Sequence, residues 1–246
     1  MNAMLKKGLV VCAVAALAIQ GFATEAETEA EWPAGAPDPK SYGYTALMLG
    51  IATPFSLPWD FDWDVFGLGV NLGYTDVNRM YGVELALGAN TARNTMVGLQ
   101  TSCLFNYANR NAYGAQVALV NVCNRETLGF SADAVGINRQ FYGFSADVLG
   151  SITDRNFYGL DVAGLGSAVR EDMWGWQIAL GGTFARRVHG LQTSIFTMTS
   201  DLRGAQIGLV NWASTCSAGF QIGLVNIIAD NQVPFIPIVN AYFPID

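Results

Sequence analysis

The amino-acid sequence predicts an all-β fold, an antiparallel up-and-down transmembrane β-barrel of about 12–14 strands built from repeats of about 15 residues. Three observations support this prediction. A short motif recurs along most of the chain, each copy alternates large apolar residues with small or polar ones, and no segment of the repeat region has the 3.6-residue period of a helix. A sheet with one apolar face and no helix to cover it must hide that face from water in another way.

The repeat is clearest in two consecutive copies, GAQIGLVN and GFQIGLVN, which begin at Gly204 and Gly219. An equivalent glycine recurs at intervals of 14 to 16 residues back to Gly67. These anchor glycines are Gly67, Gly82, Gly98, Gly114, Gly129, Gly143, Gly159, Gly175, Gly190, Gly204 and Gly219. Self-similarity at a short, fixed period indicates a repeat architecture.

Residues at odd and even distances from each anchor glycine differ in chemistry. In the copy that begins at Gly204, Ile207 and Leu209 lie at odd positions, whereas Gln206 and Gly208 lie at even ones. This alternation is the period of a β-strand with two different faces. Each repeat is therefore predicted to be one strand, with large residues on one face of the sheet and small or polar residues on the other.

The lengths of the strands and links favour an antiparallel order. A strand of about nine residues is roughly 30 Å long, and the rest of a repeat reaches at most about 20 Å. The chain could then not return to start a parallel neighbour. A barrel with its large face against lipid leaves no sheet edge and no apolar face in water. Aromatic residues before the anchor glycines would lie at both membrane interfaces, namely Tyr81, Tyr113, Tyr142, Tyr158 and Trp174.

A parallel β-solenoid is the alternative fold. It requires each repeat to bend into three short sides, with inward apolar residues in the links, and the links are mostly polar. In that fold Ile207 would be a core residue. Pro237 and the uniformly short links are untypical of a barrel, so the alternative stays open. The barrel predicts an outer-membrane surface protein with a passive channel or structural role, and the solenoid predicts a secreted, soluble binding or adhesion module.

The first 42 residues differ from the repeats. Residues 1–23 have the build of a signal peptide, residues 24–42 form an acidic, proline-rich lead-in segment, and residues 43–246 form the repeat barrel. Removal of the signal peptide takes two of the 13 Lys and Arg residues and none of the 20 Asp and Glu residues, which changes the net charge from −7 to about −9. Nucleic acid is not an expected partner, because basic clusters bind its phosphates.

The residues expected of a catalytic or metal site are scarce. His189 is the only histidine, and Cys103, Cys123 and Cys216 have no paired spacing. A nucleophilic pair of His189 and Ser194 is conceivable, but no third residue that would orient it is evident. The sequence therefore predicts no enzyme, no cofactor, no metal site and no disulfide framework.

Two sets of charged residues are candidate functional residues. Four acids share the even positions and are expected to line the barrel lumen: Glu84, Asp133, Asp147 and Asp161. They would favour cations in a pore or pair with arginines. Arginines recur in the links and are expected at the barrel rims: Arg93, Arg110, Arg125, Arg139, Arg155, Arg170 and Arg186. There they would bind phosphates of the lipid bilayer or of glycolipid, or be ordinary solvated charges.

The motif copies also resemble a known family. The pattern G-x-Q-I-G-L-V-N, followed by the ending VPFIPIVNAYF, is similar to that of bacterial surface repeat-containing proteins, which are envelope-associated. The resemblance is strongest over Gly190 to Phe243. It implies export to the bacterial outer membrane or cell surface, transfers no catalytic residue and leaves the oligomeric state open.

Overall fold

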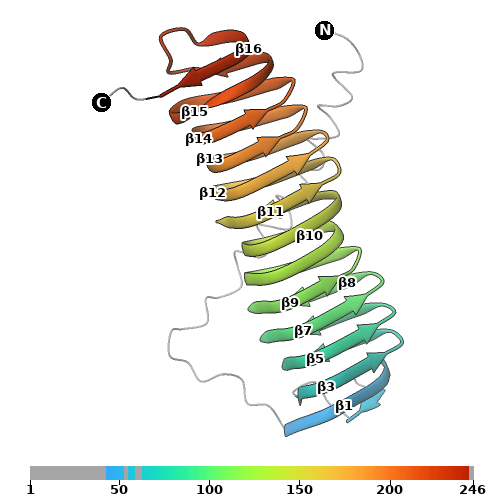
Figure 1. Cartoon of the computed structure of the whole chain (residues 1–246). Helices are drawn as coiled ribbons and strands as arrows, with labels where there is room; N and C mark the ends of the chain where they lie inside the picture. The colour runs from blue at the N-terminus through green and yellow to red at the C-terminus, as the bar shows by residue number, and fades with distance from the viewer. Residues whose placement is uncertain (1–42, 53–54, 59–62, 244–246) are drawn as a thin grey trace. The chain divides into compact units, whose positions relative to one another are not determined.

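The computed structural model describes residues 43–52, 55–58 and 63–243, which form a parallel-rich β-solenoid of about 11 turns (Figure 1). The regular elements in these ranges are all strands. They are β1 (Gly43–Ala52), β2 (Phe55–Leu57), β3 (Trp63–Asn71), β4 (Tyr74–Val77), β5 (Arg79–Ala86), β6 (Ala89–Ala92), β7 (Thr95–Ser102), β8 (Phe105–Ala108), β9 (Asn111–Val117), β10 (Val120–Thr153), β11 (Phe157–Ala163), β12 (Gly166–Ala179), β13 (Gly182–Thr193), β14 (Phe196–Ile207), β15 (Val210–Ile228) and β16 (Phe235–Tyr242). The predicted signal peptide and lead-in segment lie outside the described residues.

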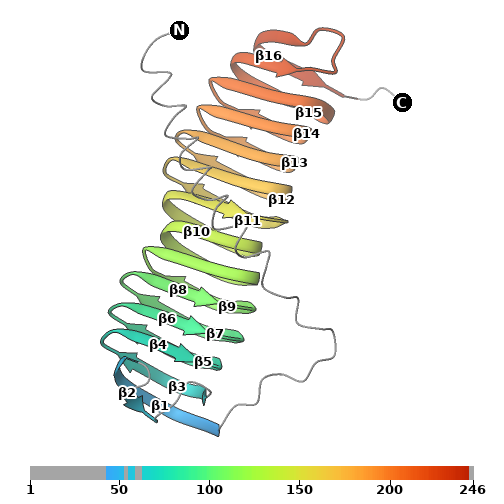
Figure 2. The same ribbon diagram turned by 180° about the vertical axis from the view of Figure 1, so that it is seen from behind.

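Each turn of the solenoid has a long side and a short side. In one turn β5 forms the long side, the chain bends at Leu87 and Gly88, and β6 forms the short side. The long strands pair in the order β3-β5-β7-β9-β10 and the short strands in the order β4-β6-β8-β10, all parallel. Figure 2 shows β4, β6 and β8 from behind. β10 and β12 to β15 each contain both short and long sides, whereas β11 forms a long side only. β10 alone has 34 residues.

The predicted antiparallel transmembrane barrel is wrong, and the solenoid alternative is confirmed. The prediction treated each repeat as one straight strand, whereas the chain bends partway and returns as a short strand. Polar links were expected to disfavour this fold because their residues would face the interior. Asn90, Asn106 and Asn121 of successive links do face it, and they hydrogen bond to one another instead of to water. Stacked amides therefore make polar links compatible with a solenoid.

The predicted division into an inner face of small or polar residues and an outer face of large ones is confirmed, although the predicted closure of the sheet into a barrel is not. Gln206 has no exposed surface, whereas Ile207 is 39% exposed and Leu209 is 50% exposed. The expectation that Ile207 would be a core residue in a solenoid is therefore wrong. Many polar side chains lie inside this protein and many large apolar ones lie outside, the reverse of the usual arrangement. The interior is packed and is not a lumen, so the passive-channel role is lost together with the barrel.

Antiparallel strands occupy the two ends of the stack. β2 pairs with β1 at one end, and β16 pairs with β15 at the other. Pro237 lies in β16, where the pairing register with β15 shifts between Gly223 and Asn226. An outermost strand with such an irregularity tolerates a residue that lacks the N–H donor. An irregular end strand also hinders edge-to-edge aggregation.

The anchor glycines stack on one another along the long side. Gly143, Gly159 and Gly175 pair in register, and φ at these glycines lies between 123° and 137°. Residues with a side chain rarely adopt this backbone conformation. A Cβ atom at Gly159 would also lie 1.9 Å from the carbonyl oxygen of Gly143. The recurring glycine of the motif is thus required by both backbone angle and contact between turns.

We predict that Gly159→Ala lowers the free energy of unfolding by on the order of 2–4 kcal/mol, because it combines a strained φ with a backbone clash. Urea denaturation followed by circular dichroism would measure the change. Gly69→Ala is the matched control, since the nearest atom to a Cβ there is the Cγ of Glu84 at 3.6 Å. Equal unfolding midpoints for the two variants would contradict the stacking argument.

Candidate binding surface

Side-chain amides form a ladder inside the C-terminal turns. Each of these glutamines lies two residues after an anchor glycine, points inward and pairs in register with its counterpart. The Nε2 atom of Gln192 donates to Oε1 of Gln177 at 2.9 Å, and that of Gln206 donates to Oε1 of Gln192 at 2.9 Å. Gln221 extends the ladder to Gln206 at 2.8 Å. Chains of buried hydrogen bonds strengthen one another in a medium of low dielectric constant.

The asparagine of the motif forms a second ladder on the short side. Nδ2 of Asn211 donates to Oδ1 of Asn226 at 2.7 Å, and Oδ1 of Asn211 accepts from the Thr197 hydroxyl at 2.7 Å. In the N-terminal half, Asn106 donates to Asn121 at 3.0 Å. A motif with Q and N five residues apart therefore places one inward amide on each side of the turn.

Apolar side chains fill the rest of the interior in two clusters. The C-terminal cluster includes Phe141 and Phe157, whose stacked rings have centroids 5.2 Å apart. The N-terminal cluster includes Met80 and Met96. The chain thus has a mixed interior in which rows of like residues lie over one another, and the large aliphatic residues left over face outward.

The bend from the long side to the short side carries an exposed aliphatic residue in most turns. We call this row the leucine edge; it consists of Leu72, Leu87, Leu104, Leu119, Leu149, Leu165, Leu180, Ile195, Leu209 and Leu224. Its members are exposed by 43% at Ile195 up to 74% at Leu180. Backbone hydrogen bonds stack successive bends, as from the N–H of Leu165 to the carbonyl of Leu149 at 2.8 Å. No exposed charged side chain lies at these bends in the described part of the chain.

A shallow apolar groove of about 620 Å³ runs beside the leucine edge in the last turns. Ile178, Ile207 and Ile222 line it on the long side, and Leu180 and Leu209 line it from the edge. A second groove of about 390 Å³ lies beside the preceding turns and shares Leu180 with the first. The apolar surface therefore continues from the edge onto the long side.

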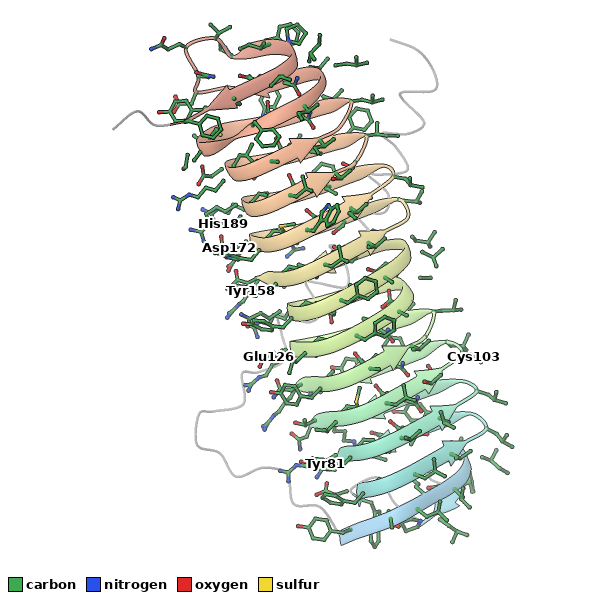
Figure 3. All side chains as sticks on the ribbon, viewed as in Figure 1. Tyr81, Cys103, Glu126, Tyr158, Asp172 and His189 are labelled. Atoms are coloured by element: carbon green, nitrogen blue, oxygen red, sulfur yellow. The ribbon has the colours of Figure 1, made fainter. Side chains whose placement is uncertain are left out.

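The opposite edge of the solenoid is charged. Figure 3 shows Glu126, Asp172 and His189 along this edge and Cys103 on the other one. We call it the charged edge; its residues include Arg79, Arg93, Arg110, Arg125, Glu126, Arg139, Asp154, Arg155, Arg170, Glu171, Asp172, Arg186, Arg187, Asp201 and Arg203. Between residues 63 and 243, charged side chains lie at or next to this edge or in the interior.

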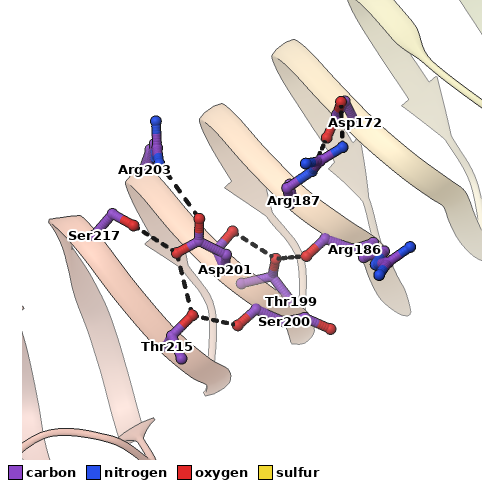
Figure 4. Close-up of polar contacts among 9 residues, drawn as sticks. All are labelled: Asp172, Arg186, Arg187, Thr199, Ser200, Asp201, Arg203, Thr215 and Ser217. Atoms are coloured by element: carbon purple, nitrogen blue, oxygen red, sulfur yellow. Dashed lines mark hydrogen bonds and ion pairs between the residues drawn. The ribbon is translucent and has the colours of Figure 1, made fainter.

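The seven predicted rim arginines all belong to the charged edge, and not to two rims. Arg93 forms a two-pronged contact with Asp76, with Nη2 2.7 Å from Oδ2. Arg170 pairs with Asp154 at 2.7 Å. Similar contacts join Arg187 to Asp172, and the carboxylate of Asp201 to Arg203 and to the hydroxyls of Thr215 and Ser217 (Figure 4). Such partly exposed pairs contribute at most about 1 kcal/mol each, so the edge is mainly a hydrated surface.

An aromatic stack lies on the long side next to the charged edge. The rings of Tyr142 and Tyr158 are 4.7 Å apart, those of Tyr158 and Trp174 are 6.3 Å apart, and those of Trp174 and His189 are 3.9 Å apart. Partial burial and the positive charge of Arg203 lower the pKa of His189. These residues were predicted to alternate between two interfaces, whereas the structure gathers them in one row.

The four predicted lumen acids are buried inside the solenoid. Burial raises the pKa of Glu84 to about 8. Burial and the neighbouring Asp133 raise the pKa of Asp147, and burial also raises the pKa of Asp161, against hydroxyl groups that lower it. Gly136 leaves room for this cluster, because a Cβ there would lie 2.7 Å from Oδ1 of Asp147. The four acids are therefore enclosed and face no channel, and burial favours the protonated form of Glu84, Asp147 and Asp161.

The remaining chemical candidates do not form a site. His189 faces outward in the aromatic stack, whereas the buried Ser194 hydroxyl donates to the carbonyl of Phe196 at 2.6 Å, so the conceivable pair is not brought together. Cys103 is exposed, and burial raises the pKa of the Cys123 and Cys216 thiols. Among the described residues no group of His, Cys, Asp and Glu is arranged to hold a metal ion.

The comparisons with known proteins add no relative. The chain matches no protein-family model, and no curated protein or solved structure matches it significantly. The resemblance to bacterial surface repeat-containing proteins therefore stays a prediction. Within the described ranges, no helix has the length and apolar character needed to cross a membrane.

The leucine edge is the feature that sequence reasoning missed. Its signal is an aliphatic residue five or six positions after most anchor glycines, as in Leu209 after Gly204. This residue was taken as part of a continuous strand face. Only a bend at this position turns it into a separate edge.

We predict that Glu84→Gln stabilises the protein at pH 7 by on the order of 3 kcal/mol. Folding raises the pKa of Glu84 from its ordinary value of 4.5 to about 8. The free energy of unfolding is therefore highest below pH 4.5, and it falls as pH rises between these two pKa values. The amide oxygen introduced by the substitution would keep an acceptor for Gln100, which now donates to Glu84 at 2.9 Å. Urea midpoints between pH 4 and 9 should fall less steeply in this variant, while Glu126→Gln, at the charged edge, should match the native profile.

We also predict that Gln192→Leu costs about 2–4 kcal/mol of stability, because Oε1 of Gln177 loses its donor and Nε2 of Gln206 loses its acceptor at 2.9 Å. The control is Leu191→Gln, which places an amide at the adjacent outward position. Chemical denaturation measures both. A smaller loss for Gln192→Leu than for its neighbour would show that the ladder contributes little.

Proposed function

We propose that this protein is a non-catalytic β-solenoid binding module, exported to the cell surface or beyond, whose partner contacts the leucine edge and the apolar long side. The observation that carries this proposal is the leucine edge itself. It runs through about ten turns without an exposed charge, while the opposite edge carries the charges. Continuous apolar surfaces of this extent mark binding sites.

The state of the polar groups supports a binding role over catalysis. Inward glutamines such as Gln100 and Gln192 hydrogen bond to the neighbouring turn, and the acids Glu84 and Asp161 are at most 1% exposed. A substrate would have to separate the turns to reach them. Export is proposed from the predicted signal peptide in residues 1–23, which lie outside the described ranges, and from the family resemblance.

Retention on a hydrophobic-interaction column tests the proposal. The triple variant Leu180→Gln, Ile195→Gln and Leu209→Gln changes exposed residues only, so its urea midpoint should stay close to that of the native chain. Its retention should fall strongly. A charged-edge variant, Arg155→Gln with Arg170→Gln and Arg186→Gln, should be retained at least as well as the native protein. Equal retention of the native chain and the leucine-edge variant would refute the proposed binding surface.

A further inference from the structure

The outer surface has one order of residue types in the turns that carry the aromatic stack, from Tyr142 to His189. The leucine edge comes first, then the aliphatic residues of the long side, then the aromatic stack, and then the charged edge. The turn containing β12 shows the order from Leu180 through Ile178 and Trp176 to Trp174 and Asp172. This is the order met on passing from the hydrocarbon of a bilayer through its interface to water.

We infer that the partner of the proposed binding surface is a lipid bilayer, and that the leucine edge enters the hydrocarbon of one leaflet while the charged edge stays in water. The inference rests on the proposed function and names its partner. Trp174 and Leu180 are six residues apart, about 20 Å of extended chain. The hydrocarbon core of a bilayer is about 30 Å thick, so the edge enters the membrane and does not cross it.

The hydrogen bonding of polar groups within the protein makes this insertion possible. In the stacked turns, backbone N–H and C=O groups hydrogen bond to neighbouring turns, including at the bends of the leucine edge. Inward side-chain amides of successive turns hydrogen bond to one another, as Nε2 of Gln206 does to Oε1 of Gln192. Burial of the edge in hydrocarbon therefore leaves few polar groups unpaired, which is the main requirement for protein surfaces in lipid.

The chemistry of the surface favours lipid over a protein partner. Protein interfaces carry about one hydrogen bond per 100–200 Å², and the leucine edge offers almost no side-chain donor or acceptor. Acyl chains need neither. The groove beside Ile207, Leu209 and Ile222 is lined mainly by aliphatic groups and suits a hydrocarbon chain in the same way.

Cys103 provides a probe within the leucine edge. It is exposed beside Leu104, while Cys123 and Cys216 are buried with raised thiol pKa values and react slowly. Cys12, in the predicted signal peptide, would be replaced by serine so that it is not labelled. An environment-sensitive fluorophore would then be attached to Cys103. The control carries Cys103→Ser and Ser200→Cys, because Ser200 is an exposed residue next to Asp201 on the charged edge.

Both labelled proteins would be mixed with vesicles of phosphatidylcholine and floated on a density gradient. We expect both to float, with the Cys103 label shifted to the blue and quenched by lipids brominated on their acyl chains, and the label at position 200 unchanged. The triple leucine-edge variant should partition at least about tenfold less into vesicles. Binding should be insensitive to salt and no stronger to anionic vesicles, since the chain has a net charge of −7.

Other outcomes separate the two proposals. A native chain that stays in the aqueous fraction as an oligomer, with Cys103 protected from thiol reagents, would have a second copy as its occupant; this overturns the lipid inference and keeps the binding surface. Salt-sensitive binding to anionic vesicles, or quenching only at position 200, would assign contact to the charged edge and also overturn it. A monomer that neither floats nor differs from the triple variant in column retention would overturn both proposals.

Discussion

The hydrogen bond from one side-chain amide to the equivalent amide in the next turn is the interaction on which this architecture depends. Gln206 can satisfy Gln192 and Gln221 only if the three residues lie directly over one another. The same register places each anchor glycine over the previous one, where a carbonyl oxygen leaves no space for a Cβ. The amide ladder and the glycine ladder therefore keep successive repeats in register, which limits the spacing of the anchor glycines to 14 to 16 residues.

The period, the strand content and the two faces of the strands could be predicted from sequence, because they depend on neighbouring residues. Gln206 inside and Ile207 outside follow from alternation alone. The closure of the sheet could not be predicted in this way. It depended on whether the chain bends near Leu87 and Gly88, and on whether a polar link such as the one with Asn90 can be buried. The polar link can be buried because identical amides of successive turns hydrogen bond to one another. This contact is between repeats and cannot be recognised in the sequence of a single repeat.

The same distinction applies to the binding surface. Arginines in the links and acids at even positions were found from the sequence, but their grouping depends on strand direction. Antiparallel strands would divide the arginines between two rims, whereas parallel turns return Arg139 and Arg155 to the same edge, where their backbones hydrogen bond. The parallel order likewise gathers Leu149 and Leu165 into one row. The solenoid thus has an apolar edge and a charged edge, although leucines and arginines alternate along the sequence.

The middle turns depart from the ladder in a way that bears on cooperativity. Between Gln116 and Gln177 the amide row is replaced by Ser131, Ser145 and Asp161. The two apolar clusters also divide within this region, where one has its last residue, Cys123, and the other its first, Phe141. Between these residues the Thr127 hydroxyl donates to Oδ1 of Asn138 at 2.7 Å. In a stacked array, stability is close to a sum over neighbouring turns. We therefore expect the polar middle to be the weakest junction. It should weaken as pH rises through the raised pKa values of Asp147 and Asp161, since deprotonation there buries negative charge. The two halves of the solenoid are accordingly the expected cooperative units of folding. Each half is stabilised by its own amide ladder and its own apolar cluster.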